Sequence, residues 1–144
     1  MVRILFLCVG NACRSQMAEG WTRHVRGGEM EAYSAGTESR GIDPLAVKAM
    51  AEAGVDISGQ RSKSLDEVRT VGFDWVITLC DSARETCPVF PGNVKRTHVD
   101  FDDPPKLAAG TEDEEEKLKP YRRVRDEIRT FIESLEVSDA ERGF

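Results

Sequence analysis

The sequence predicts a three-layer α/β/α fold, with one four-stranded parallel sheet in a single domain over residues 1–144. Apolar runs of strand length alternate along the chain with segments of helical apolar spacing. Such alternation builds right-handed β-α-β units, which place helices on both faces of a parallel sheet. No repeat, linker or change of composition divides the chain, and 144 residues suit one hydrophobic core.

The first strand and the first helix flank a short loop. Val2 to Leu7 (VRILFL) is typical of a buried strand, and a helix is expected from Ser15 to the pair Gly27-Gly28. The apolar residues of this helix recur every four positions: Met17, Trp21 and Val25. Glu29 to Ala35 is the expected second strand.

The middle of the chain predicts a second helix and two more strands. Asp43-Pro44 opens this helix with a capping residue and a proline, and Gly54 ends it. Ser64 to Glu67 has the capping-box pattern of a short helix. Asp74 to Leu79 is dense enough in apolar residues for a strand covered on both faces, and Val94 to Val99 is the fourth strand.

The last third of the chain predicts one long helix. Its apolar positions have helical spacing: Tyr121, Val124, Ile128, Phe131, Ile132 and Leu135. The acidic run from Glu112 to Glu116 is expected to be a solvated loop before that helix. Residues from about Val137 onward are expected to fray.

Composition and charge favour a globular protein of the cytoplasm. The formal net charge of −6 supplies no basic field, so we expect neither nucleic acid nor a membrane surface as a partner. Val2 to Val9 is too short for a signal peptide, and no run approaches the ~18 apolar residues of a membrane span. We therefore expect the four cysteines to be in a reducing compartment, where structural disulfides are rare. The cysteines lack the paired two-residue spacing of zinc sites, and only His24 and His98 could act as histidine ligands, so we expect no zinc site. We expect a monomer.

The loop between the first strand and the first helix has the composition of an oxyanion site. Its N–H groups and the helix dipole attract an anion, and Arg14 can hold two oxygens of that anion with its planar fork. A thiol such as Cys8 ionises more readily in the same field, and Ser15 can donate a hydrogen bond to the thiolate. We therefore interpret Cys8 as a nucleophile that attacks the central atom of a phosphate-like anion. A purely structural strand, loop and helix is the alternative.

Two further cysteines follow the third strand. Because the carboxyl ends of parallel strands share one edge, Cys80 is expected near Cys8. If residues 80–87 were helical, the Cα atoms of Cys80 and Cys87 would be ~10 Å apart. A disulfide needs about 7 Å or less. Bonding of this pair would therefore require the segment to unwind, which suggests a mobile redox loop. Two buried structural cysteines are the alternative.

An aspartate before a proline follows the fourth strand. Pro104 biases Asp103 toward an extended conformation, and a carboxyl group held over the loop can protonate a departing oxygen. An ordinary Asp-Pro turn is equally compatible with the pattern. His98 is expected to be a structural strand residue and His24 a surface or boundary residue.

Five segments together resemble the thioredoxin-coupled arsenate reductases of the low-molecular-weight protein tyrosine phosphatase superfamily. They are CVGNACRSQMAEGW, YSAGTESRGIDP, VITLCDSARETCP, FDDP and YRRVRDEIRTFIESL. The resemblance extends from Arg3 to about Leu135 and implies reduction of arsenate to arsenite, in arsenic detoxification, without a bound cofactor. Thioredoxin, or a glutaredoxin-like reductant, would regenerate the protein.

The resemblance implies a role for each matching residue. Cys8 would form a thiol–arsenate adduct, Cys80 would attack Cys8 and Cys87 would then attack Cys80. The last disulfide would pass to the reductant. Asp103 would be the general acid and Ser15 would support the thiolate. The oxyanion would lie against the loop residues Val9, Gly10, Asn11, Ala12, Cys13 and Arg14.

Two departures from the family concern a possible metal site and an acidic stretch of the chain. Some relatives bind potassium through residues that match Asn11, Glu19 and Ser34, together with an aspartate. Lys63 stands at that aspartate position, and its ammonium would supply the metal's charge, so we expect no metal site. The acidic stretch 106–119 is longer than the resemblance implies and has no assigned role. Cys13 is shared across the superfamily, and we expect it to have no part in the reaction cycle.

Two other functions remain open. A small tyrosine phosphatase would share the nucleophile, the arginine and the general acid. Such phosphatases line the cleft with aromatic residues, whereas Pro105 and Lys106 follow Pro104 here. Weak residual phosphatase activity is nevertheless expected. A redox or oxyanion sensor without turnover is the second alternative.

Overall fold

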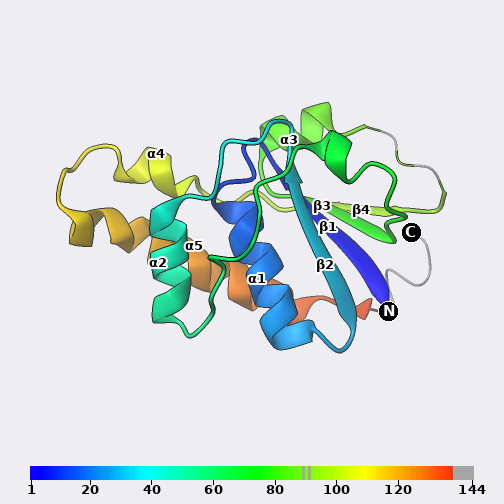
Figure 1. The fold of residues 1–144 in the computed structure, drawn as a ribbon, viewed down its shortest axis with the longest axis horizontal. Helices are drawn as coiled ribbons and strands as arrows, with labels where there is room; N and C mark the ends of the chain where they lie inside the picture. The colour runs from blue at the N-terminus through cyan, green and yellow to red at the C-terminus, as the bar shows by residue number, and fades with distance from the viewer. Residues whose placement is uncertain (89, 91, 138–144) are drawn as a thin grey trace.

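The computed structural model describes residues 1–88, 90 and 92–137, and Figure 1 shows their arrangement. Within these residues, one sheet holds four parallel strands in the order β2-β1-β3-β4. The strands are β1 (Val2–Cys8), β2 (Met30–Gly36), β3 (Trp75–Thr78) and β4 (Lys95–His98). The helices are α1 (Arg14–Arg26), α2 (Pro44–Glu52), the 3-10 helix η1 (Leu65–Glu67), α3 (Asp81–Thr86), α4 (Pro104–Ala108) and α5 (Glu114–Ser134).

Helices cover both faces of the sheet, so the predicted three-layer fold is confirmed (Figure 1). The larger core lies between the sheet and the layer of α1, α2 and α5, and it includes Ile4, Phe6 and Trp21. Leu5 and Leu7 face the opposite way, toward the smaller layer of η1 and α3. These four residues of β1, from Ile4 to Leu7, are fully buried, because a central parallel strand is covered on both sides.

The predicted boundaries agree with the structure in the first half of the chain. Asp43 caps α2, its Oδ1 accepting a hydrogen bond of 2.9 Å from the backbone N–H of Leu45. Gly54 ends this segment with a φ of +86°, a left-handed conformation that glycine adopts without strain. The capping box before η1 is also present, since the backbone N–H of Ser64 donates to the carboxylate of Glu67.

The loop prediction for Glu112 to Glu116 is wrong in its last three residues, which form the first turn of α5. Asp113 caps the helix, its Oδ1 accepting from the backbone N–H of Glu115. Carboxylates near the positive end of the helix dipole stabilise that end, so an acidic run can begin a helix. α4 was not expected either, and it begins at Pro104 because proline suits a first helical turn.

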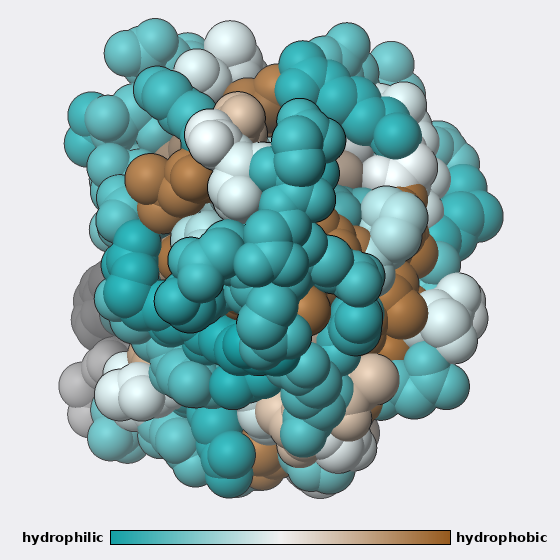
Figure 2. All heavy atoms as spheres, turned by 90° about the vertical axis from the view of Figure 1, so that its left-hand side faces the viewer, coloured by the Kyte–Doolittle hydropathy of each residue, from teal (hydrophilic) through white to brown (hydrophobic). Residues whose placement is uncertain are grey.

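Hydrophilic residues cover most of the face formed by α4 and the beginning of α5 (Figure 2). Glu114, Glu115 and Glu116 contribute to it and are exposed. In the described part of the chain, no helix combines the length and hydropathy that crossing a bilayer requires. The predicted fraying after Val137 falls on residues 138–144, outside the described residues.

Candidate active site

Four segments, one at the end of each strand, meet at one edge of the sheet. They enclose a cleft of about 460 Å³ next to the carboxyl end of β1. Its lining comprises Cys8, Val9, Gly10, Ala12, Cys13, Arg14, Arg40, Cys80, Asp81, Ser82, Asp103 and Pro105. Cys8, Arg14, Cys80 and Asp103, which the sequence singles out, therefore share one cleft. None of the described lining residues is aromatic.

The loop after β1 is fixed by hydrogen bonds from its carbonyl groups to the segment after β2. The backbone N–H groups of Thr37, Glu38, Arg40 and Asp43 donate to the carbonyls of Cys8, Val9, Gly10 and Ala12, at 2.9–3.2 Å. In a planar trans peptide the N–H points opposite to the C=O. The next N–H groups along the loop therefore point away from that segment. This arrangement is how a loop presents several donors to an anion.

Cys8 lies beside the hydroxyl group of Ser15. The Cys8 Sγ and Ser15 Oγ atoms are 2.8 Å apart. Ser15 Oγ also accepts a 2.8 Å hydrogen bond from Asn11 Nδ2. Because Asn11 donates to that oxygen, the Ser15 hydroxyl can give its own hydrogen to the sulfur. A donor in this position stabilises a thiolate.

Asn11 is the centre of the buried network beneath the loop. Its φ of +48° is left-handed, a conformation that asparagine tolerates better than most residues. Its Oδ1 accepts from Gln16 Nε2 at 2.9 Å and from the backbone N–H of Lys63 at 2.7 Å. Both Asn11 and Gln16 are fully buried. From the sequence, Asn11 was expected only as a loop residue against the oxyanion and as a match to a potassium ligand of some relatives. Gln16 was missed, although a polar pair next to a functional loop is a usable signal.

Arg14 connects the loop to the segment after β4. Its Nη1 donates to the carbonyl of Phe101 at 2.8 Å, and its Nη2 lies 3.8 Å from Asp103 Oδ1. The backbone N–H of Phe101 donates in turn to the carbonyl of Leu79. These contacts hold the Asp103 carboxyl group at the cleft, where an acid for a leaving oxygen is needed.

Cys80 and Cys87 flank the two ends of α3. Cys80 is the residue before the helix, is 7% exposed and lines the cleft. Cys87 is the residue after it and lines a different pocket of about 230 Å³ with Arg84 and Arg96. The segment 81–86 is helical, as the estimate of a ~10 Å separation between Cys80 and Cys87 assumed. All four cysteines are free. Burial raises the pKa of the Cys87 thiol, and Arg96 opposes this.

Cys13 is a buried residue of the loop itself, and its surroundings favour the neutral thiol. Burial raises the pKa of its thiol well above the ordinary value, and the carboxylate of Asp43 adds to the rise. Tyr121 donates a 2.5 Å hydrogen bond to Asp43 Oδ2, which keeps that carboxylate in place. A neutral thiol is a weak nucleophile, so this environment favours Cys8 over Cys13 as the attacking sulfur.

The ammonium group of Lys63 lies close to the buried carboxylate of Glu19. Lys63 Nζ donates to the carbonyl of Arg61 at 2.6 Å and is 3.6 Å from Glu19 Oε1. The same Glu19 oxygen accepts from Ser34 Oγ at 2.6 Å, and Arg23 pairs with the other oxygen at 2.7 Å. Burial lowers the pKa of Lys63, while Glu19 acts against this shift. The Glu19 carboxylate, 2% exposed, thus has two cationic partners within the protein.

The fold is shared with a solved low molecular weight protein tyrosine phosphatase, which is 30% identical with a TM-score of 0.72. Residues 3–141 match the family model of the low molecular weight phosphotyrosine protein phosphatases, and the chain belongs to this family.

Within the family, the chain is similar to several proteins named as arsenate reductases. That of Halalkalibacterium halodurans is 52% identical over 91% of this chain and 95% of its own. A solved arsenate reductase in a phosphate-binding state is 29% identical, has a TM-score of 0.77 and matches 97% of this chain and 99% of its own. A thioredoxin-dependent arsenate reductase of Corynebacterium glutamicum is also 29% identical, with a TM-score of 0.67. It matches over 96% of this chain and 63% of its own.

Proposed function

We propose that this protein reduces arsenate to arsenite through a relay of three thiols and is regenerated by thioredoxin. The observation that carries the proposal is the placement of Cys8 and Cys80 on one cleft with Arg14, with Cys87 at the far end of a six-residue helix. The arsenate reductases among its relatives suggest arsenate as the substrate. Arsenate has the charge and the tetrahedral shape of phosphate, so one site can bind either anion.

The first step forms a covalent adduct. The Cys8 thiolate, supported by Ser15, attacks arsenic and forms a sulfur–arsenic bond. Arg14 and the loop N–H groups hold the remaining oxygens, as in other oxyanion sites. One arsenate oxygen leaves as water after Asp103 protonates it. Arsenic is still pentavalent at this stage.

The second step transfers the electrons. The Cys80 thiolate attacks Cys8 Sγ and forms a disulfide, while the sulfur–arsenic bond breaks and its electron pair remains on arsenic. Arsenic leaves as trivalent arsenite, and the two sulfurs are oxidised. Both cysteines line the same cleft, so this step needs less motion than the next one.

The third step moves the disulfide away from the cleft. The Cys87 thiolate attacks Cys80 Sγ, and Cys8 departs as a thiolate ready for another arsenate. Because α3 separates the two sulfurs in the resting protein, its six residues must unwind. The resulting disulfide would be exposed to the dithiol of thioredoxin. A glutaredoxin-like reductant is the alternative, and the cytoplasm is the proposed compartment.

A coupled assay tests this function. With thioredoxin, thioredoxin reductase and NADPH, arsenate is expected to oxidise NADPH in equal amount. Cys80→Ser and Cys87→Ser should abolish that oxidation but keep a slow hydrolysis of aryl phosphate, because neither residue is needed to hold phosphate. If both variants still reduce arsenate, or if both lose aryl phosphate hydrolysis too, the relay is refuted.

A tyrosine phosphatase is the second candidate, favoured by the family match and by a cleft that fits phosphate. The lack of aromatic residues in the described lining leaves no surface to stack on a phenyl ring. We therefore propose only residual phosphatase activity. Rapid aryl phosphate hydrolysis that is independent of Cys80 would instead favour the phosphatase.

Potassium is expected to have no effect on the reaction. The Lys63 ammonium and Arg23 already neutralise Glu19, so a metal ion would meet positive charge there. Rates measured in potassium chloride and in sodium chloride at equal ionic strength should therefore agree. A several-fold activation by potassium would contradict this assignment of Lys63.

A further inference from the structure

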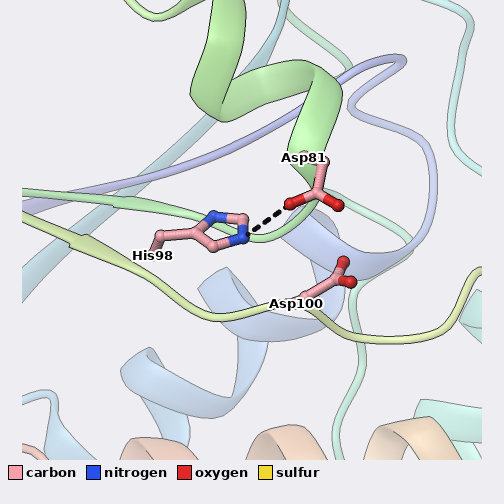
Figure 3. A group of neighbouring side chains, drawn as sticks. All are labelled: Asp81, His98 and Asp100. Atoms are coloured by element: carbon pink, nitrogen blue, oxygen red, sulfur yellow. Dashed lines mark ion pairs between the residues drawn. The ribbon is translucent and has the colours of Figure 1, made fainter.

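Three side chains outside the thiol relay converge where β4 ends and α3 begins (Figure 3). Asp81 is the first residue of α3, His98 is the last residue of β4, and Asp100 follows two positions later. One nitrogen or oxygen atom from each lies within 4.8 Å of the others. Imidazole nitrogen and carboxylate oxygen are both ligands for divalent first-row metal ions.

The two nitrogens of His98 have different surroundings. Nδ1 is 2.8 Å from the hydroxyl of Thr78, whereas Nε2 is buried and has no hydrogen bond. Nε2 faces Asp81 Oδ1 at 3.2 Å (Figure 3). Metal-binding histidines usually have one nitrogen fixed by such a partner while the other faces the ion. An imidazole held in this way is oriented before any metal arrives.

The carboxylates can approach an ion placed beside Nε2. Asp81 and Asp100 are both exposed, and a carboxylate oxygen of each already lies within 4.8 Å of a ring nitrogen of His98. Arg84 Nη2 lies 3.4 Å from Asp81 Oδ1 and competes with a metal for that oxygen. The second oxygen of Asp81 and the carboxylate of Asp100 still offer two negatively charged groups. One imidazole and two carboxylates give three protein ligands, and water can complete the set.

We propose that Asp81, His98 and Asp100 form a binding site for a divalent first-row transition-metal ion such as Zn²⁺. An ion bound there connects the first residue of α3 to the end of β4. Because α3 must unwind before Cys87 can reach Cys80, the ion would restrain the third step of the relay. This consequence rests on the proposed function, whereas the binding site itself does not.

Binding is tested on the reduced full-length protein with Zn²⁺ in equilibrium dialysis and with Co²⁺ as a spectroscopic probe. His98→Gln should weaken binding at least tenfold, and Asp81→Asn with Asp100→Asn should do the same. Thr78→Val, which removes the hydroxyl behind Nδ1, is expected to weaken it by about tenfold. His24→Gln and Asp66→Asn are matched controls on exposed side chains and should leave affinity unchanged.

Two results would overturn the site. One is Zn²⁺ affinity that is the same in the native protein and in all the site variants. The other is a Co²⁺ spectrum dominated by thiolate charge transfer that persists in His98→Gln, since the metal would then lie on cysteine.

The restraint on α3 is tested by amide hydrogen exchange over residues 81–86, which needs no arsenate and no thioredoxin. Zn²⁺ should slow this exchange several-fold in the native protein and leave it unchanged in His98→Gln. If Zn²⁺ binds at His98 without slowing exchange, the restraint is refuted and the metal site stands. Failure of arsenate reduction would affect neither measurement.

Discussion

Ser15 joins the nucleophile to the buried network through one hydroxyl group. Asn11 donates to its oxygen, and Gln16 and the Lys63 backbone fix Asn11. The Ser15 hydroxyl can therefore donate its own hydrogen to the sulfur of Cys8, 2.8 Å away. A charge-assisted hydrogen bond of this kind contributes about 1.5–3 kcal/mol. The reactivity of Cys8 therefore depends on residues that never touch the anion.

Ser15→Ala is expected to slow alkylation of Cys8 by iodoacetamide about tenfold to hundredfold at neutral pH, because the thiolate loses its donor. Peptide mapping after a timed reaction would measure this rate. Ser34→Ala is the matched control, since Ser34 is also fully buried but donates to Glu19. Equal rates in the native protein and in Ser15→Ala would contradict the assigned role.

Cys87 gives the relay a dependence on pH. Burial raises the pKa of its thiol, so little thiolate exists at neutral pH and its fraction grows as pH rises. Formation of the Cys80–Cys87 disulfide in a single turnover should accelerate up to about tenfold per pH unit from pH 6.5 to 8.5. Quenched samples analysed by mass spectrometry would follow it. A rate that falls with pH over this range would exclude Cys87 as the attacking thiol.

At the scale of elements, the loop after β1 takes its shape from the end of β2. Gly36 lies so close to the loop that an added Cβ would meet the carbonyls of Val9 and Glu38 and the backbone nitrogen of Asn11. All three of these are backbone atoms, which cannot rotate away as a flexible side chain can. The close contact of two backbone segments is what holds the loop's carbonyls outward.

Gly36→Ala is therefore expected to destabilise the protein by about 1–3 kcal/mol and to weaken arsenate or phosphate binding, because the loop must move. Urea unfolding and phosphate titration would measure the two effects. Gly28→Ala is the control, since a Cβ there meets nothing within 4 Å. If Gly36→Ala binds phosphate as the native protein does, the loop does not depend on this contact.

The short elements show where sequence patterns stop being informative. β1, α1 and α2 carry capping residues or long apolar periods, and these predicted their extents closely. α4 has only five residues and the beginning of α5 has no apolar stripe, so neither had a periodic signal. The charge of Glu114 to Glu116 alone suggested a loop. These residues are helical because Asp113 caps the helix and the helix dipole stabilises carboxylates at this end.

At the scale of the whole molecule, parallel topology explains how distant segments form one site. Cys8, Cys80 and Asp103 follow three neighbouring strands, and the carboxyl ends of those strands share an edge. The parallel direction of the strands and the chemistry of the residues at their carboxyl ends were therefore enough to predict the cleft. The network of Asn11 and Gln16 and the cluster at His98 were not predictable, because they depend on side-chain contacts between segments far apart in sequence.

Mass mapping of disulfides during arsenate turnover tests the three-thiol relay most directly. The reduced protein is mixed with arsenate without thioredoxin, and free thiols are blocked by alkylation at timed intervals. The account predicts a Cys80–Cys87 disulfide as the product, with Cys8 and Cys13 alkylated, and a Cys8–Cys80 disulfide that accumulates in Cys87→Ser. A product disulfide between Cys8 and Cys13, or release of arsenite with no disulfide at all, would contradict it.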